Sequence, residues 1–223
     1  MAKLIIAIDG PSGAGKGTVA RSLASQLGYR HVDSGAMYRA VAWRALQQGI
    51  ALDNEEALAA LAAGAQIDVS PAAVTIDGAD VTHTIRTPDI DRAAAAVARL
   101  PRVRACLVER QRRLGAGGGI VMEGRDIGTV VFPNADVKLY LDASPDERAK
   151  RRAADPAHTG GPSAVSDVGT MLAQRDELDR TRVASPLYAA PDAHFIDTTG
   201  KSVGEVAAEV MMLVQEKFHF LSL

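Results

Sequence analysis

Residues 10–18, GPSGAGKGT, form the stretch whose composition and spacing point most directly to chemistry. Gly10, Gly15 and Lys16 have the spacing of a phosphate-binding P-loop. In such a loop, backbone N–H groups turn inward around phosphate oxygens, and the lysine adds a positive charge near the outer phosphates. We therefore expect the loop to bind a nucleoside triphosphate through Gly10, Pro11, Ser12, Gly13, Ala14, Gly15, Lys16, Gly17 and Thr18.

The hydroxyl that usually follows the lysine of a P-loop arrives one position late, at Thr18. We expect Thr18 to serve Mg²⁺ directly or through water. A guanine-specifying Asn-Lys-x-Asp motif is absent from the sequence. Residues 197–200, DTTG, fit a GTPase switch pattern but follow the last predicted strand instead of an early one. A GTPase is therefore disfavoured.

A second group of candidate residues lies in RDELDRTR, residues 175–182. On a helix, Arg175, Asp179 and Arg182 share one side, where they could clamp an anion. The same helix would turn three other charges toward solvent: Asp176, Glu177 and Arg180. By itself the segment fits a solvated helix face at least as well as a clamp.

Two further segments place polar groups where a ligand would lie. In HVDSGAMYR, Asp33 and Ser34 suit a helix N-cap, and Tyr38 and Arg39 follow one turn later. The sequence GRD, residues 124–126, follows the apolar run GIVM, and doubly wound sheets bind ligands at the carboxyl ends of their strands. We expect both segments to face the P-loop.

Several arginines around a P-loop suit transfer of a phosphoryl group to a phosphate monoester. The second pKa of a monoester is about 6, so the acceptor is mostly a dianion at neutral pH. Its oxygen needs no general base, whereas a hydroxyl acceptor would need a carboxylate beside it. The site must instead hold two polyanions together, which guanidinium groups do well.

The elements that would position these residues alternate between strand and helix. The apolar run LIIAI, residues 4–8, predicts a buried strand before the P-loop, and residues 18–28 predict the helix after it. The same cycle recurs at three places: residues 119–126, 137–152 and 194–214. This alternation predicts a doubly wound α/β fold with a parallel sheet.

Three regions depart from this alternation. Residues 67–85 carry short alternating pieces around an Asp-Gly turn, which predicts a small β excursion. Residues 154–166 are rich in Gly, Pro and Ser and predict a mobile flap. Residues 92–114 have helical spacing throughout except at Pro101, which should end one helix and begin the next.

Composition excludes several classes of function. The chain has 223 residues, 47% of them hydrophobic, and a net charge of −2, so it can bury a core but has no broad basic surface for a nucleic acid polymer. Cys106 is the single cysteine and excludes an internal disulfide, and the five histidines are too scattered for a metal site. No run is apolar and long enough for a membrane span, and the N-terminal run is too short for the core of a signal peptide, so we expect a cytoplasmic protein. We also expect a monomer.

The sequence resembles the bacterial cytidylate kinases, within the nucleoside monophosphate kinase family. The motifs are VDSGAMYR, IRTP, PRVR, EGRDIGTVVFP with VKLYLDAS, and RDELDRTR before PL, in that family's order. The resemblance implies a single P-loop kinase domain over residues 1–223, a monophosphate-binding insert at about 34–105 and a lid at about 150–166. It further implies γ-phosphoryl transfer from ATP to CMP and dCMP with Mg²⁺ as cofactor. Another acceptor such as UMP or dTMP, or a regulatory protein that only binds ATP, remains an alternative.

The resemblance also implies roles for individual residues. Arg39, Arg125 and Arg182 would hold the CMP phosphate. Arg175 and Asp179 would reach the ribose or nearby phosphates, Arg104 with Asp126 would read the cytosine edge, and Ser34 would lie beside the base. Three arginines of the helix before the flap would close over the transferring group: Arg148, Arg151 and Arg152. The catalytic residues that the resemblance implies are Lys16, Arg125, Arg148, Arg152 and Arg182.

Two parts of the chain depart from the family pattern. Ala95 stands where the family usually has a serine near the cytosine, and the flap is less charged than usual.

Overall fold

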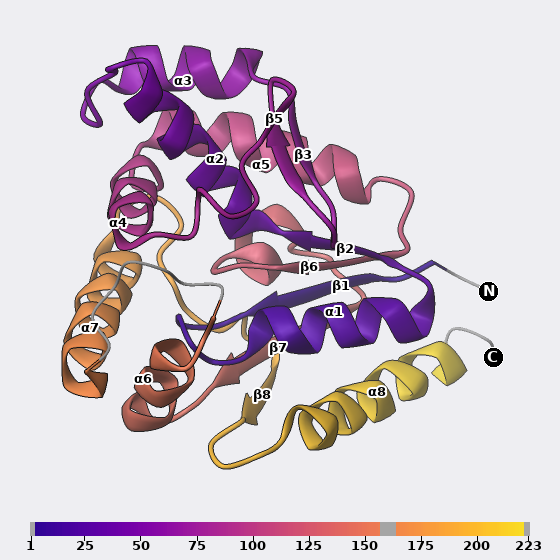
Figure 1. The fold of residues 1–223 in the computed structure, drawn as a ribbon. Coiled ribbons are helices and arrows are strands. Elements are labelled where there is room, and N and C mark those ends of the chain that lie inside the picture. The colour runs from indigo at the N-terminus through magenta and orange to yellow at the C-terminus, as the bar shows by residue number, and fades with distance from the viewer. Residues whose placement is uncertain (1–2, 157–163, 221–223) are drawn as a thin grey trace.

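A five-stranded sheet forms the centre of the molecule (Figure 1). This computed structural model describes residues 3–156 and 164–220. All strand pairs of the sheet are parallel. The strand predicted at residues 4–8 is its middle strand, β1. In spatial order the strands are β2 (Arg30–Asp33), β6 (Ile120–Glu123), β1 (Ile5–Asp9), β7 (Val137–Asp142) and β8 (His194–Asp197).

Helices cover both faces of this sheet. On one face, α1 (Lys16–Leu27) and α8 (Val203–Phe220) bury residues such as Leu23 and Val210 against the strands. On the other face, α5 (Pro101–Gly115) and a five-residue π-helix, η1 (Ile127–Val131), pack against β6 and its neighbours. The predicted doubly wound α/β fold is therefore confirmed.

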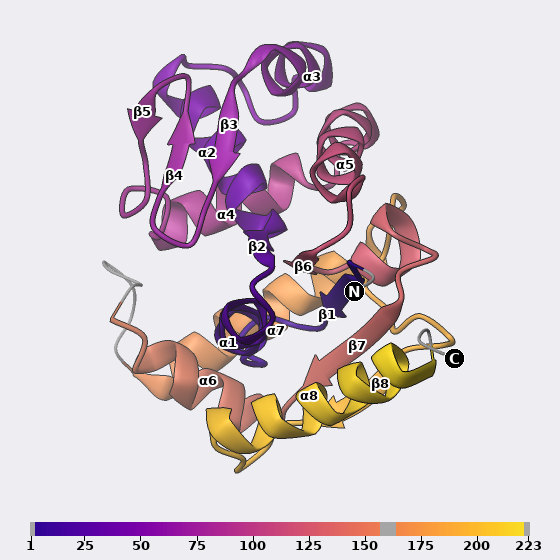
Figure 2. The same cartoon turned by 90° about the vertical axis from the view of Figure 1, so that its right-hand side faces the viewer.

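The segment between β2 and α5 forms a second layer with its own hydrophobic core. It contains three helices, α2 (Ser34–Gln47), α3 (Glu55–Gly64) and α4 (Pro88–Val97). It also contains an antiparallel sheet, β3 (Ile67–Val69), β4 (Val74–Ile76) and β5 (Ala79–Asp80), which confirms the predicted β excursion. The turn between β4 and β5 uses Asp77 and Gly78, both with positive φ. Figure 2 shows this layer on the opposite side of the central sheet from α8.

The break predicted at Pro101 is confirmed, because α4 ends at Val97 and Pro101 opens α5. Two remaining helices, α6 (Pro145–Ala153) and α7 (Val165–Thr181), pack against each other and flank the predicted flap. Residues 157–163 of that flap lie outside the described residues. Among the described helices, none is long and apolar enough to cross a membrane.

Candidate active site

A cleft of about 510 Å³ opens at the carboxyl ends of the parallel strands. The P-loop, the second layer, α6 and α7 all contribute to its walls. Each strand of the central sheet ends in an acidic residue: Asp9, Asp33, Glu123, Asp142 and Asp197. Because the strands are parallel, these residues lie along one edge of the sheet, where doubly wound folds bind ligands, and two of them, Asp33 and Glu123, line the cleft.

The P-loop joins β1 to α1 and depends on glycine. Gly10, Gly13 and Gly15 all have positive φ, and a Cβ on Gly10 would lie 1.9 Å from the carbonyl oxygen of Leu141. Gly15 caps α1 without a side chain, so the N–H groups of the first turn face the cleft as an anion would require. The side chain of Lys16 is buried and its Nζ donates to the carbonyl oxygen of Pro11 at 2.7 Å.

Burial dominates the electrostatics of Lys16. Desolvation and the nearby Arg125 lower the pKa of Lys16 from 10.5 to about 7, although carboxylates around it act in the opposite direction. Burial thus weakens the preference of Lys16 for its charged form. A phosphate in the cleft would favour the charged form.

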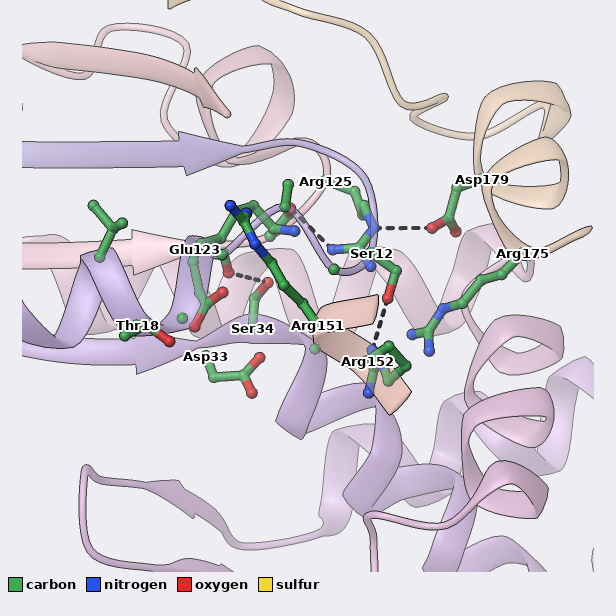
Figure 3. A pocket seen from close by; sticks show the side chains of 18 of the residues that line it. Ser12, Thr18, Asp33, Ser34, Glu123, Arg125, Arg151, Arg152, Arg175 and Asp179 are labelled. Carbon is green, nitrogen blue, oxygen red and sulfur yellow. Dashed lines mark hydrogen bonds and ion pairs between the residues drawn. The ribbon is translucent and has the colours of Figure 1, made fainter. Parts of the chain in front are cut away.

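Thr18, Asp33 and Glu123 lie along one wall of the cleft, next to the P-loop (Figure 3). The carboxylate of Asp33 accepts from the backbone N–H of Ala36, which makes Asp33 the N-cap of α2, and from Arg39 at 2.7 Å. Although burial opposes ionisation, Arg39 is foremost among the groups that lower the pKa of Asp33 to about 2. Asp33 is therefore a permanent anion in this wall.

Glu123, at the end of β6, and Ser34, at the start of α2, contact each other in this wall. Oε1 of Glu123 lies 3.3 Å from Nε2 of the buried His31. Ser34 was expected with Asp33 at a helix N-cap; Asp33 is the cap, and Ser34 is the first residue of α2, with its hydroxyl donating to the carbonyl oxygen of Glu123 at 2.7 Å. Among the described residues there is no cluster of three or more His, Cys, Asp or Glu side chains that could hold a metal ion.

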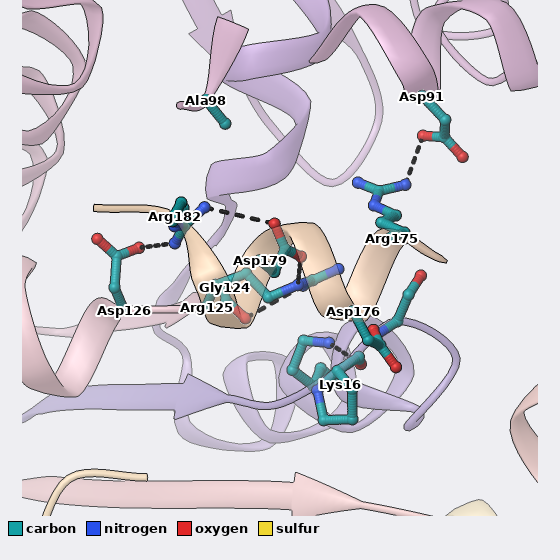
Figure 4. A network of polar contacts seen from close by, with 12 residues as sticks. Lys16, Asp91, Ala98, Gly124, Arg125, Asp126, Arg175, Asp176, Asp179 and Arg182 are labelled. Atoms are coloured by element: carbon teal, nitrogen blue, oxygen red, sulfur yellow. Dashed lines mark hydrogen bonds and ion pairs between the residues drawn. The ribbon is translucent and has the colours of Figure 1, made fainter. Parts of the chain in front are cut away.

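Five charged side chains of alternating sign form a network in the cleft, and Figure 4 shows four of them, Asp126, Arg182, Asp179 and Arg125. In order they are Arg104, Asp126, Arg182, Asp179 and Arg125. Arg104 and Asp126 form a close buried ion pair, Arg182 lies 3.8 Å from Asp126 and 3.4 Å from Asp179, and Nε of Arg125 donates to Asp179 at 2.9 Å. The carboxylates hold the three guanidinium groups near one another before any ligand arrives.

The surroundings of the network shift the pKa of Asp179 and of the neighbouring Tyr38. Although burial opposes ionisation, Arg125 and its neighbouring arginines hold the pKa of Asp179 below its usual value. Burial raises the pKa of Tyr38 to about 12, so its hydroxyl stays protonated, and its ring lies 5.3 Å from the guanidinium carbon of Arg104.

A second set of arginines enters the cleft from the helices that flank the flap. Arg152 donates to the hydroxyl of Ser12 at 2.7 Å, and burial lowers the pKa of Arg152 to about 10, which leaves it charged at neutral pH. Arg151 donates to the carbonyl oxygen of Thr198 at 2.7 Å. Arg175 forms an ion pair with Asp91 at 3.0 Å.

The cleft brings together most of the residues predicted from the sequence. The P-loop residues that line it are Ser12, Gly13, Ala14, Gly15, Lys16, Gly17 and Thr18, whereas Gly10 and Pro11 support the loop from outside the lining. The other predicted residues that line it are Ser34, Arg39, Arg104, Arg125, Asp126, Arg151, Arg152, Arg175, Asp179 and Arg182. Ala95 lines it as well, together with Ala94 and Ala98.

Two expectations about charged residues need correction. Arg148 does not line the cleft; it is buried behind the P-loop, where it pairs with Asp176. Asp176 does not face solvent, because it is only 1% exposed. In addition, α7 ends at Thr181, so Arg182 reaches the cleft from the residue after the helix and not from its face.

Sequence reasoning also missed residues that line the cleft. Asp33 was noted only as a cap, and Glu123 was given no role, although each ends a strand of the central sheet and lines the cleft. For Glu123, the acidic residue that ends the predicted strand GIVM was a usable signal. Asp33 gave no such signal, because its strand was not predicted.

Comparisons with known proteins identify the family of the chain. The sequence model of the cytidylate kinase family matches residues 6–216. The chain is 44% identical over 217 residues to a cytidylate kinase from Solibacter usitatus (strain Ellin6076), covering 96% of this chain and 94% of that protein. It is 47% identical over 219 residues to a cytidylate kinase from Geobacillus thermodenitrificans (strain NG80-2), covering 96% and 98%.

Solved structures of lower identity share the fold. A gluconokinase from Sinorhizobium meliloti 1021 is 15% identical, with a TM-score of 0.53 and coverage of 99% of this chain and 98% of that one. A shikimate kinase from Bacteroides thetaiotaomicron is 11% identical, with a TM-score of 0.51 and coverage of 96% and 99%. The match of the family model to nearly the whole chain and the close relatives lead to one conclusion: the chain belongs to the cytidylate kinase family.

Proposed function

We propose that this protein transfers the γ-phosphoryl group of ATP to CMP, and also to dCMP, giving ADP and the corresponding diphosphate. Membership of the cytidylate kinase family supports the reaction. The observation that carries it is the meeting, in one cleft, of a P-loop with guanidinium groups from α2, α5, α6, α7 and the segment after β6.

The need for these guanidinium groups follows from the charges of the substrates. At about 4 Å, two unit charges interact by roughly 1 kcal/mol in water and by about 4 kcal/mol at an effective dielectric constant near 20. Two nucleotides brought end to end in a closed site therefore repel each other strongly unless cations lie between them. Arginine suits this task because it binds phosphate oxygens in pairs and keeps its proton.

The donor would occupy the P-loop. Backbone N–H groups from Gly13 to Thr18 and the ammonium of Lys16 would hold the phosphates at the N-terminus of α1. Arg152, fixed by its bond to Ser12, would approach the transferring phosphoryl group from the lid side. The residues around Thr198, which also line the cleft, would lie near the ATP base.

The acceptor would occupy the network on the other side of the cleft. Arg39, Arg125 and Arg182 would bind its phosphate, and Arg175 and Asp179 its ribose or a nearby phosphate. For the base edge, a guanidinium with a carboxylate offers both a donor and an acceptor, which suits cytosine, and Arg104 with Asp126 forms such a pair. Ser34 would lie beside the base. The acceptor oxygen is already ionised, so we assign no general base.

Mg²⁺ would be the cofactor, and the residues present fit it. The hydroxyl of Thr18 and the carboxylates of Asp33 and Glu123 share one wall beside the P-loop, and oxygen donors are those that Mg²⁺ prefers. Since Mg²⁺ keeps several of its waters, these three side chains would hold it through its water shell. When bound, the ion neutralises phosphate charge.

The parts of the chain would have separate tasks. Residues 34–105 would bind the acceptor, and residues 150–166 would close over the donor and exclude water from the γ-phosphate. We propose that a monomer is active, because one chain supplies all the groups assigned above. The cytoplasmic location expected from the sequence stays a prediction.

A coupled ADP-release assay over CMP, dCMP, UMP and dTMP tests the proposal, and we expect the highest kcat/KM with CMP. We also expect Arg182→Ala to weaken CMP binding more than tenfold while ATP affinity changes little. Greater activity with UMP or dTMP would overturn the choice of acceptor. Tight ATP binding without transfer to any acceptor would favour a regulatory protein instead.

A further inference from the structure

Ser12 of the P-loop is enclosed by three side chains from the two helices that flank the lid. Its backbone N–H donates to Oδ1 of Asp176 at 3.3 Å, and its carbonyl oxygen accepts from Arg148 at 3.2 Å. Its hydroxyl accepts from Arg152 at 2.7 Å (Figure 3). Every polar group of this buried residue is therefore bound by α6 or α7.

Arg148 and Asp176 also bind each other. They form a close ion pair in which both side chains are at least nine-tenths buried. Nε of Arg148 donates in addition to the carbonyl oxygen of Ala143, at the end of β7, at 3.1 Å. The backbone of Gly13 lies so close that a Cβ there would be 2.9 Å from Cβ of Arg148. The pair thus fastens α6, α7, β7 and the P-loop at one point.

The position of the Arg148–Asp176 pair next to the cleft indicates what the pair does. One helical turn further along α6, Arg151 and Arg152 enter the cleft, and on α7 Arg175 and Asp179 do so. The two helices therefore carry side chains to the substrates, while the P-loop holds the phosphates of the donor. Their relative position decides whether the arginines meet the transferring group, and a displacement of about 1 Å can cost about a hundredfold in rate.

We propose that Arg148 and Asp176 are positioning residues for phosphoryl transfer. They touch no substrate. They fix Ser12, and through Ser12 and Arg152 they set the distance between the donor site and the arginines of the lid helices. The N–H of Ser12, bound by Asp176, is withheld from the donor phosphates, so the anion site begins at Gly13.

A buried ion pair of this kind could also serve stability alone, and one double variant separates the two roles. Replacing both partners of a buried pair by apolar residues is often neutral or stabilising. Arg148→Met with Asp176→Leu should therefore fold, while it removes both bonds to the backbone of Ser12. We expect kcat to fall about tenfold or more, with the Kd for CMP within about twofold of the wild type. Recovery of wild-type kcat in a stably folded double variant would show a purely structural role.

A milder substitution covers the case in which the double variant fails to fold. Asp176→Asn keeps an oxygen that can accept from Ser12 but removes the charge that holds Arg148, so we expect an intermediate loss of kcat. Glu177→Gln is the matched control, since it removes the same charge from the next, exposed residue of α7. Equal kcat values for Asp176→Asn and Glu177→Gln would overturn the proposal.

The kinetic measurements rest on the proposed function, whereas amide hydrogen exchange tests the Ser12 contact without it. Amide hydrogen exchange at Ser12, followed by NMR without nucleotide, should be faster in the double variant because its acceptor is gone. Unchanged exchange would contradict the contact itself. A wild-type protein that transfers nothing to CMP would refute the proposed function and leave this structural result standing.

Discussion

Asp91 and Arg175 form an ion pair at 3.0 Å that joins α4 to α7 across the cleft. Both side chains are mostly buried, with exposed fractions of 14% and 19%. The same carboxylate also favours the charged forms of Arg39 and Arg152. In the unliganded protein, Asp91 is therefore a counter-ion for arginines that would otherwise face one another, and an acceptor phosphate would compete with it for Arg175.

Asp91→Asn should consequently tighten CMP binding. The substitution removes a negative charge that the acceptor phosphate must displace or tolerate, and we expect the Kd for CMP to fall three- to tenfold, the change that about 1 kcal/mol produces. Isothermal titration calorimetry without ATP measures it. Asp89→Asn is the control, because Asp89 is exposed on the same helix and pairs only with the exposed Arg92 in the described structure. Weaker CMP binding by Asp91→Asn would mean that Asp91 orients Arg175 instead of competing for it.

ATP binding should be coupled to proton uptake by Lys16. The pKa of Lys16 is about 7 in the unliganded protein, and bound phosphates must raise it because they favour the ammonium form. Between pH 7 and the pKa of the complex, binding therefore takes up a proton, and affinity for ATP falls as pH rises. Calorimetry at pH 7.5 in buffers of different ionisation enthalpy counts the protons. Lys16→Met, which cannot titrate, should show less uptake, and equal uptake would assign the proton to another group.

Asp9 should anchor the segment that carries Arg125 and Asp126. Its carboxylate accepts from the backbone N–H groups of Ile127 and Gly128 at 2.8 and 2.7 Å. An asparagine can accept only one of these bonds without turning its own N–H₂ toward the other donor. We expect Asp9→Asn to lower the free energy of unfolding by about 1–3 kcal/mol, the cost of an unsatisfied buried group. Urea unfolding measures it, and a loss below about 0.5 kcal/mol would contradict the assigned role.

The pH dependence of Asp9 has the opposite sign to that of a carboxylate whose pKa is lowered on folding, such as Asp33. Burial raises its pKa from 3.8 to about 6, although the two N–H groups act against this. The folded state therefore binds the proton more tightly than the unfolded state does. Protonation of Asp9 therefore adds stability that is fully present below pH 3.8 and is lost as pH rises through 6, whereas the two hydrogen bonds that the carboxylate accepts remain above pH 6. The difference in stability between wild type and Asp9→Asn should shrink over that interval.

Much of this site could be predicted from sequence because its strongest signals are local. The P-loop spacing, the apolar run before it and the glycine that ends α1 at Gly28 each depend on neighbouring residues only. The order of strands and helices then placed GRD and the lid arginines at the same edge of the sheet. These are the parts that the structure reproduces.

The remaining parts depend on contacts between distant segments. A helical pattern shows that Asp176 and Arg175 point in different directions, but it does not show that the P-loop lies against Asp176. The same holds for Arg148, whose basic neighbours Arg151 and Arg152 do reach the cleft. The π-helix after Asp126 also escaped prediction, since the two N–H groups at its start are held by Asp9, 118 and 119 residues earlier.

Ser185 binds Arg182 through its carbonyl oxygen and has a strained backbone conformation. Its φ is +55°, which is unfavourable for a residue with a Cβ and more so before a proline, Pro186. Its carbonyl oxygen accepts from Nε of Arg182 at 2.6 Å. Ser185→Gly should relieve the strain, keep this backbone contact and raise the free energy of unfolding by about 0.5–1 kcal/mol. Ser185→Val should lower stability and weaken CMP binding. Equal stability of the glycine and valine variants in urea unfolding would show that this conformation costs nothing.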